Sequence, residues 1–423
     1  MKHRRISNIC SNGIPIHLLC ELLNIHDLKS LQRTNQYFKA ETYLKAKPTV
    51  KINNYCDGIK IIKQFKYTKL IGSDINKNEQ LRQLPSLTSL RVFKNPECFI
   101  DKKMFATNYG FEFLTNLTEL DLSFDRSVTT AGISHLTKLK RLSLVLTSKI
   151  GRNKISLLSN LTNLTDLNLE FNDSFREDAL IYTPTLKYLN LTSNKKISKI
   201  SIAGLTYLNL SDNGCLTDES LCQLINVQSL NLVLNRLITD AGMASLINLT
   251  DLNISMNNNI SDLGLLFLTN LRTLDMSETN KITNAGISKM TNLTYLDLSN
   301  NSIIGDDGIS ELTNLKSLRI QGMMKYVPIT DAALSNLTNL TFLDISWNNS
   351  ITNAGLINLT NLEILAVKGN KHITSGDHLM KLRVIIADFH SVFGPLDKYH
   401  VSRSYEKYCE FGGCYPWGSI NLI

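Results

Sequence analysis

The chain has 423 residues, 43% hydrophobic and 19% charged, a composition typical of globular proteins rather than disordered ones. Its net charge of +8 resides in residues 1–80, which hold 14 Lys and Arg against 6 Asp and Glu, whereas residues 81–423 hold 31 of each. Because most of the chain is balanced, a basic groove for nucleic acid along it is not expected.

The cysteine spacing and the apolar runs indicate an intracellular location. Eight cysteines occur without a CxxC pair or a framework spacing, which favours a reducing environment over a disulfide scaffold. The basic start is followed by an apolar run that Pro15, His17 and Glu21 interrupt, which argues against a signal peptide. No stretch approaches the roughly 20 apolar residues that cross a bilayer. We therefore expect an intracellular protein, in the cytoplasm or nucleus, that is not secreted.

Residues 14–39 form the first predicted helical segment. Pro15 suits the first turn of one short helix, and Asp27 suits the cap of a second. Leucines at helical spacing predict an apolar stripe on each helix, namely Leu18, Leu19, Leu22 and Leu23 on the first and Leu28 and Leu31 on the second.

Residues 40–66 are rich in Lys, with scattered Ile and Phe, and they overlap the segment 46–86. We expect a basic linker here, with degenerate first repeats near residues 50–52 and 69–71. Its positive charge is expected on a solvated face. The alternatives are contact with an acidic partner, and nuclear import through the basic start of the chain, Lys2-His3-Arg4-Arg5.

Residues 205–320 repeat one phrase every 22 residues. The phrase reads L-x-x-L-x-L, as in residues 293–298, and usually continues to an Asn such as Asn213 or Asn235. Self-similarity at a fixed period indicates a solenoid. Six phrases open at Leu205, Val227, Leu249, Leu271, Leu293 and Leu315; others open earlier at Leu87, Leu117, Leu139, Leu164 and Leu186, and later at Leu340, Leu362 and Leu382.

The phrase predicts how each repeat folds. Its second and third leucines alternate with polar residues, which is the pattern of a short strand with one buried face. The Asn after the strand is expected to turn inward and bond neighbouring backbone. In the second half of the repeat, Thr283 or Asn284 can cap a short helix, and Gly286 permits close packing against the next repeat. Its equivalents are Gly132, Gly242, Gly264, Gly308 and Gly355.

These features predict an α/β solenoid of horseshoe form, with a parallel sheet on the concave face and short helices or 3₁₀ turns on the convex face. We expect a small helical segment at residues 1–45, the basic linker and degenerate repeats at 46–86, the solenoid at 87–390 and a C-terminal cap at 391–423.

The repeated phrase resembles leucine-rich repeats, and I-T-x-A-G is similar to repeats of the F-box/leucine-rich-repeat and GALA types. Residues 14–39 resemble an F-box, with a proline, a leucine helix, Asp27-Leu28 and a terminal aromatic. Ile14 replaces the usual Leu, and His17 stands where an acidic residue is common. The many Asn, Ile and Lys residues are typical of AT-rich genomes, such as those of some protists and giant DNA viruses.

The resemblance implies a substrate-recognition adaptor of a Skp1–cullin–F-box ubiquitin ligase, which holds a protein substrate on the concave face. The alternative is a stand-alone binding scaffold or inhibitor, in which the first helices only cap the solenoid. Under the first reading, a Skp1-like adaptor contacts Ile14, Pro15, Leu18, Leu19, Leu22, Leu23, Leu28 and Leu31.

The polar and aromatic strand positions are the candidate partner-binding residues. Aromatic side chains anchor protein interfaces and polar ones orient them. We expect a partner with basic or amide-rich contacts along residues 251–344. The alternative is that Asp and Asn serve only solubility. The candidates are Tyr188, Tyr207, Asp251, Asp275, Tyr295, Asp297, Phe342 and Asp344.

No enzyme, cofactor or metal site is predicted. The histidines are scattered, and a regular carboxylate ladder on a surface is not expected to act as a pocket with split pKa values. The gaps between His390, His400, Cys409 and Cys414 fit no familiar zinc module. We expect a monomer that binds neither nucleic acid nor membranes.

Overall fold

The computed structural model describes residues 49–52, 69–72, 81–82, 85, 87–92, 107–125, 127–147, 150, 158–323, 326–387 and 400–402. The chain divides into two compact units, which hold residues 1–189 and residues 190–421. The predicted helical segment at residues 14–39 lies outside the described residues. So does most of the predicted C-terminal cap.

In the first unit, strands β1 to β6 pair in parallel and in chain order. β1 and β2 occupy the two places at which degenerate repeats were predicted. The strands are β1 (Thr49–Ile52), β2 (Lys69–Gly72), β3 (Ser89–Val92), β4 (Glu119–Asp121), β5 (Arg141–Ser143) and β6 (Asp166–Asn168). The described helices are α7 (Asn108–Phe111), α8 (Thr130–Ile133) and α10 (Glu177–Leu180), and β7 (Tyr188–Asn190) contains the boundary between the units.

In the second unit, strands β8 to β17 also pair in parallel and in chain order. They are β8 (Tyr207–Asn209), β9 (Ser229–Asn231), β10 (Asp251–Asn253), β11 (Thr273–Asp275), β12 (Tyr295–Asp297), β13 (Ser317–Arg319), β14 (Phe342–Asp344), β15 (Ile364–Ala366), β16 (Val384–Ile386) and β17 (His400–Ser402). β17 was not predicted, since its residues lack the repeated phrase.

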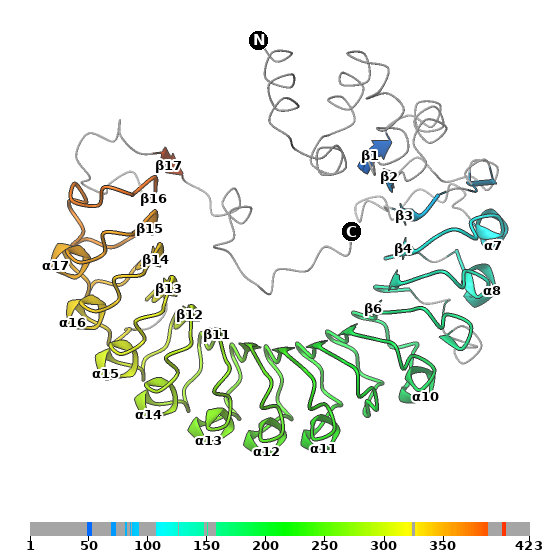
Figure 1. Ribbon diagram of the computed structural model, residues 1–423, viewed down its shortest axis with the longest axis horizontal. Coiled ribbons are helices and arrows are strands. Elements are labelled where there is room, and N and C mark those ends of the chain that lie inside the picture. The colour runs from blue at the N-terminus through cyan, green and yellow to red at the C-terminus, as the bar shows by residue number, and fades with distance from the viewer. Residues whose placement is uncertain are drawn as a thin grey trace, which may run out of the picture. The chain divides into compact units, whose positions relative to one another are not determined.

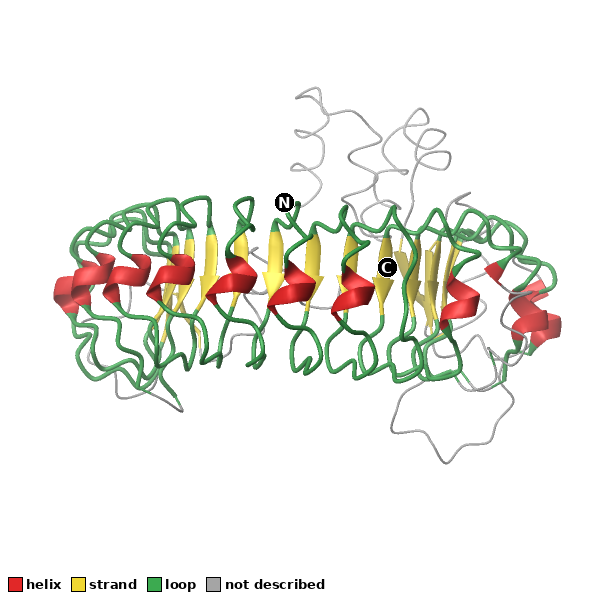
Figure 2. Ribbon diagram, turned by 90° about the horizontal axis from the view of Figure 1, so that it is seen from below, coloured by secondary structure: helices red, strands yellow, loops and turns green. Residues whose placement is uncertain are grey.

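One short helix lies between most successive strands of this unit, on the side opposite the strands (Figures 1 and 2). The helices are α11 (Asp218–Leu221), α12 (Asp240–Met243), α13 (Asp262–Leu265), α14 (Asn284–Ile287), α15 (Asp306–Ile309), α16 (Asp331–Leu334) and α17 (Asn353–Leu356). The predicted leucine-rich-repeat solenoid, with its parallel sheet and short helices, is therefore confirmed.

The leucines of the phrase form the core. Leu293, Leu296 and Leu298 are each fully buried, and the equivalent residues of the other repeats are buried in the same way. One repeat has no second layer to cover these side chains, so the leucines of the adjacent turns do so. Each buried leucine contributes about 1.5–3 kcal/mol, which explains why the repeats fold only as a stack.

The Asn after each strand links successive turns, as predicted. Asn213 is 1% exposed, and its Nδ2 donates to the Asn194 carbonyl of the preceding repeat at 2.9 Å. Its Oδ1 accepts from the backbone N–H groups of Cys215 and Leu216, both at 3.0 Å. The side chain thus satisfies buried backbone groups in two turns.

A second link runs along the helices. Thr283 caps α14 by accepting from the Ala285 N–H at 3.3 Å, as predicted. Thr283 also donates its hydroxyl and backbone N–H to the Asp262 carboxylate of the preceding repeat, both at 2.7 Å. Ser261 and Asp240 form the same pair one repeat earlier. A Cβ on Gly264 would lie 2.5 Å from Asp240 Oδ1, so glycine makes room for this link.

The residue before each inward-turned polar side chain has a positive φ, and several of these residues are large and apolar. In the first unit they are Phe124, Leu146 and Phe171, which are 37%, 45% and 48% exposed. This conformation costs a non-glycine residue about 1–2 kcal/mol. The positive φ turns the next side chain, an Asn, Asp or Thr, into the core. The buried position of that side chain therefore imposes the backbone conformation and its cost.

Candidate protein-binding face

The strands of the second unit present two columns of side chains beside their buried leucines. Both columns follow the parallel register from β8 to β14. The outer column holds Tyr207, Ser229, Asp251, Thr273, Tyr295, Ser317 and Phe342. The central column holds Asn209, Asn231, Asn253, Asp275, Asp297, Arg319 and Asp344. We call the two columns together the strand face.

The central column has a structural role of its own. Asn253, Asp297 and Asp344 each use Oδ1 to accept a bond from the backbone N–H two residues later, at 2.9, 2.9 and 3.0 Å. This bond holds the turn that ends the strand, as Asx side chains commonly do. Preference for Asp or Asn at this position therefore follows from local folding, and does not by itself identify a binding residue.

Asp275 and Asp297 are partners in the register of β11 and β12, and both are 3% exposed. The pKa of Asp275 is raised, mainly because the carboxyl is buried. Hydrogen bonds from Ser277 and the positive charge of Arg319 act in the opposite direction. Burial and the nearby Asp275 raise the pKa of Asp297 from 3.8 to about 7, although Arg319 partly opposes this. The sequence predicted a regular carboxylate ladder on a surface, whereas these two carboxyl groups are buried.

Neighbouring side chains complete this part of the column. Asn253 Nδ2 donates to Asp275 Oδ2 at 3.0 Å, and Gln321 donates to Asp344. The Arg319 guanidinium lies 5.1 Å from the centre of the Phe342 ring. Carboxylates, amides and one stacked cation thus share this part of the column across five adjacent strands, β10 to β14.

The predicted site residues differ in their access to a partner. Tyr207 and Asp251 are half-buried and remain accessible. Tyr295 and Phe342 are 8% and 3% exposed, so little of either ring is accessible, and Asp344 is fully buried. Tyr188 is 8% exposed and lies in the first unit.

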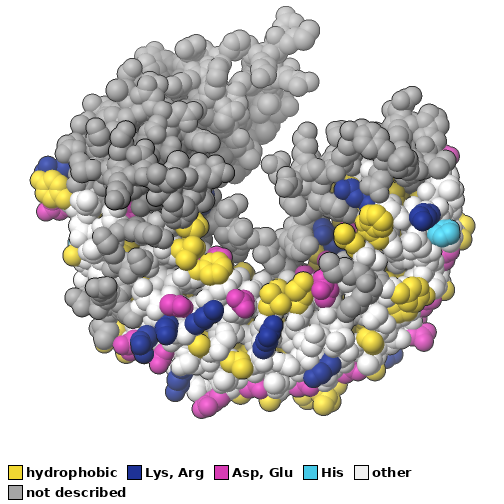
Figure 3. Space-filling model, turned by 180° about the vertical axis from the view of Figure 1, so that it is seen from behind, with side chains coloured by type: hydrophobic (Ala, Val, Ile, Leu, Met, Phe, Trp, Pro, Cys, Tyr) yellow, Lys and Arg dark blue, Asp and Glu magenta, His cyan; other side chains and the backbone are white. Residues whose placement is uncertain are grey.

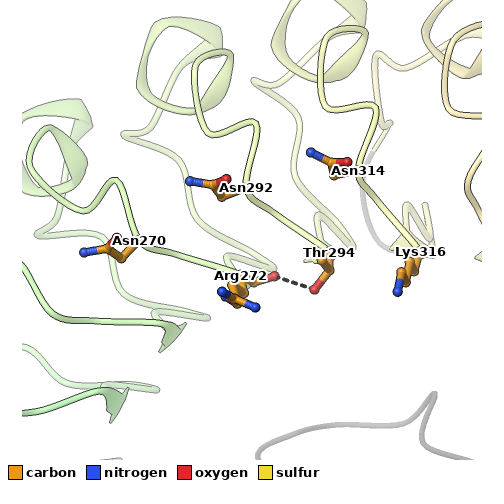
Figure 4. A pocket seen from close by; sticks show the side chains of 6 residues that line it. All are labelled: Asn270, Arg272, Asn292, Thr294, Asn314 and Lys316. Carbon is orange, nitrogen blue, oxygen red and sulfur yellow. Dashed lines mark hydrogen bonds between the residues drawn. The ribbon is translucent and has the colours of Figure 1, made fainter.

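Sequence reasoning missed two features of the second unit. Trp347 is 46% exposed with a φ of 60°, because it occupies the turn position after β14. A hollow of about 360 Å³ also lies where β11, β12 and β13 begin (Figure 4). The sequence signal for this hollow is a basic residue just after the first leucine of the phrase. Arg272 and Lys316 occupy this position, two repeats apart.

The described part of the chain contains neither a cluster of metal ligands nor a membrane-spanning helix. No group of three His, Cys, Asp or Glu residues there could hold a metal ion. No helix among those described has the length and apolarity to cross a membrane. On the face seen in Figure 3, acidic, basic and apolar side chains are interspersed among uncharged ones.

The predicted adaptor-binding residues lie outside the described residues, so the structure does not place them. They are Ile14, Pro15, Leu18, Leu19, Leu22, Leu23, Leu28 and Leu31. Their assignment stays a prediction from the sequence.

Family models match the repeats. A model described as leucine-rich repeats in two copies matches residues 247–289. A model described as a leucine-rich repeat matches residues 205–221, 223–247, 289–313 and 336–360. No curated protein matches the chain.

Solved structures share the fold at low identity. A leucine-rich-repeat protein of Leptospira interrogans is 20% identical, with a TM-score of 0.55 over 84% of this chain and 99% of that one. A chain of the Toll–Spätzle complex from Drosophila is 16% identical, with a TM-score of 0.53 over 87% of this chain and 52% of that one. A chain of the yeast Rad7–Elc1 complex is 18% identical, with a TM-score of 0.46 over 70% of this chain and 83% of that one.

At these identities the neighbours show the fold alone. Together, the matched repeats, the parallel strands and the structural neighbours lead to one conclusion. The chain contains leucine-rich repeats and folds as a leucine-rich-repeat solenoid.

Proposed function

We propose that this protein is a substrate-recognition adaptor of a Skp1–cullin–F-box ubiquitin ligase. The leucine-rich-repeat fold implies protein–protein interaction, and the strand face is the observation that supports a recognition role. Its side chains stand on short strands whose backbone bonds and buried leucines hold them in place, so a partner meets a pre-organised surface. The ligase link is supported by the F-box resemblance of residues 14–39.

In this proposal the protein performs no chemistry and needs no cofactor. It works as an intracellular monomer that binds neither nucleic acid nor membranes. Leu22 and Leu23 contribute to contact with a Skp1-like adaptor, and the strand face holds the substrate. A soluble protein presents an apolar stripe to solvent mainly where a partner covers it.

The adaptor link is tested by calorimetry of the purified full chain with a Skp1-like protein. We expect binding by the parent and none by Leu22→Asp/Leu23→Asp. The matched control is Leu263→Asp, because Leu263 is 70% exposed on α13 and receives the same kind of substitution. Circular dichroism confirms that each variant is folded.

Absence of binding by the parent, or equal loss in the Leu263 control, would remove the ligase link. The alternative function, a stand-alone binding scaffold or inhibitor, would then stand.

The strand face is tested separately at its accessible residues. We propose that it binds a partner with basic or amide-rich contacts through Tyr207 and Asp251. The other candidates of this face, Asp275, Tyr295, Asp297, Phe342 and Asp344, are at most 8% exposed and help to position that surface, and Tyr188 belongs to the first unit. Tyr207→Ala/Asp251→Lys should abolish capture of a partner protein that the parent enriches in quantitative mass spectrometry. Glu311→Lys, an exposed residue outside both columns, should retain that partner. Equal capture by all three proteins would refute the assignment.

A further inference from the structure

The hollow at the start of β11, β12 and β13 is separate from the strand face. It lies one phrase position before the outer column, where the chain enters each strand (Figure 4). It has a volume of about 360 Å³ and is lined by Asn270, Arg272, Asn292, Thr294, Asn314 and Lys316. These residues come from three consecutive repeats and include no carboxylate.

Hydrogen bonds to the backbone hold part of this lining. Asn270, Asn292 and Asn314 each donate Nδ2 to a carbonyl of the preceding repeat, at 3.0, 3.0 and 2.9 Å. Thr294 donates its hydroxyl to the Arg272 carbonyl at 3.1 Å. Each amide has a second N–H and an oxygen with two lone pairs, which suit the backbone of an extended peptide.

The two cations of the hollow differ from Arg91 and Arg383, which lie at or beside other strands. Arg91 pairs with Asp121 at 2.9 Å, and Arg383 lies 3.8 Å from Glu363. Among the described residues, neither Arg272 nor Lys316 has an ion-pair partner, and both side chains are exposed. The hollow therefore offers two positive charges that the described part of the protein does not neutralise.

The spacing of the charges indicates the ligand. Arg272 and Lys316 occupy the same phrase position two strands apart, which corresponds to about 10 Å. An extended peptide covers that distance in about three residues. Guanidinium forms paired bonds with a carboxylate, and ammonium acts as a compact point charge.

We propose that this hollow binds an acidic peptide segment of a protein partner. The segment lies across the starts of β11, β12 and β13, with one carboxylate at Arg272 and another at Lys316. Its backbone bonds the three Asn amides between them. Two cations suit a short acidic segment, whereas nucleic-acid backbones are bound through a longer series of phosphate contacts. This hollow is independent of both the F-box-like segment and the strand face.

The test is fluorescence anisotropy of the purified full chain with a labelled peptide that has glutamate at every third position and glycine between, which matches the spacing of the two cations. The same peptide with glutamine in place of glutamate should not bind. Arg272→Glu/Lys316→Glu should weaken binding of the acidic peptide at least about tenfold, since two charge-assisted contacts become repulsive.

The control variant is Arg236→Glu/Lys281→Glu. These residues are also exposed and two repeats apart, but they lie in the loops that follow the strands. The control makes the same change in net charge, so it should bind the peptide within about twofold of the parent if the local contacts matter. Thermal melting confirms that both variants are folded.

The proposal would be overturned by failure of the parent to bind the acidic peptide, by equal binding of the glutamine peptide, or by equal loss in the control variant. Preference for a single-stranded oligonucleotide over the peptide would likewise replace it with a nucleic-acid site. Leu22→Asp/Leu23→Asp should bind the peptide normally, which separates this result from the test of the ligase link.

Discussion

Replacement of Asp297 by Asn should increase stability at neutral pH. The folded protein raises the pKa of this carboxyl from 3.8 to about 7, chiefly because burial disfavours the charged form. Between these pH values the folded state holds the proton more tightly than the unfolded state. Stability therefore falls as pH rises through this window, and it changes little above the folded pKa.

The expected gain follows from the shift. Each pKa unit corresponds to about 1.4 kcal/mol, so the rise from 3.8 to about 7 costs about 4 kcal/mol once the carboxyl is ionised. Asn keeps the shape and can still accept from the Ser299 N–H, which Asp297 Oδ1 accepts at 2.9 Å. Asp297→Asn should match the parent near pH 4 and exceed it by up to about 4 kcal/mol at pH 8.

The assay is urea unfolding of the full chain at a series of pH values, followed by circular dichroism. Asn231→Ser is the control, because it changes the same column without removing a carboxylate. It should lower stability by a similar amount at every pH. If the difference between Asp297→Asn and the parent stayed constant from pH 4 to pH 8, the assigned burial of a protonated carboxyl would be wrong.

Three further substitutions test two contacts between repeats and one strained turn, each by the free energy of unfolding in urea. Gly264→Ala should cost about 2 kcal/mol, because the added Cβ would lie 2.5 Å from Asp240 Oδ1. The control Gly214→Ala, whose Cβ would have no contact within 4 Å, should be nearly neutral, and equal effects of the two substitutions would refute this reason. Asn213→Ala should cost about 3 kcal/mol, because it leaves buried backbone groups without partners; a change below about 1 kcal/mol would contradict that role. Phe171→Asn should add about 1 kcal/mol, since Asn tolerates positive φ; a loss would show that the exposed ring makes contacts that outweigh its strain.

Much of the second unit was predictable from the period alone. Every repeat meets a nearly identical neighbour, so the environment of one residue applies to its equivalents. The burial of Leu296, the two-sided bonds of Asn213 and the cap of Thr283 all follow from this regularity, and the structure confirms them. β17 was missed because its residues lack the leucine phrase.

The candidate site was less predictable. The sequence placed Asp275 and Asp297 in one column, and the register confirms that they are adjacent. Accessibility does not follow from register, because it depends on every side chain that packs around the column. Tyr207 and Asp251 retain access, whereas Phe342 does not.

The amino-acid sequence by itself determined the solenoid, its strands, its core and the links between its turns. These depend on a local pattern that recurs at a fixed distance along the chain. Only the tertiary structure decided that two adjacent carboxyls lose their solvent, and that Arg272 and Lys316 line one hollow without carboxylates. Desolvation and charge pairing depend on which side chains of different repeats meet, and the repeating pattern does not specify them.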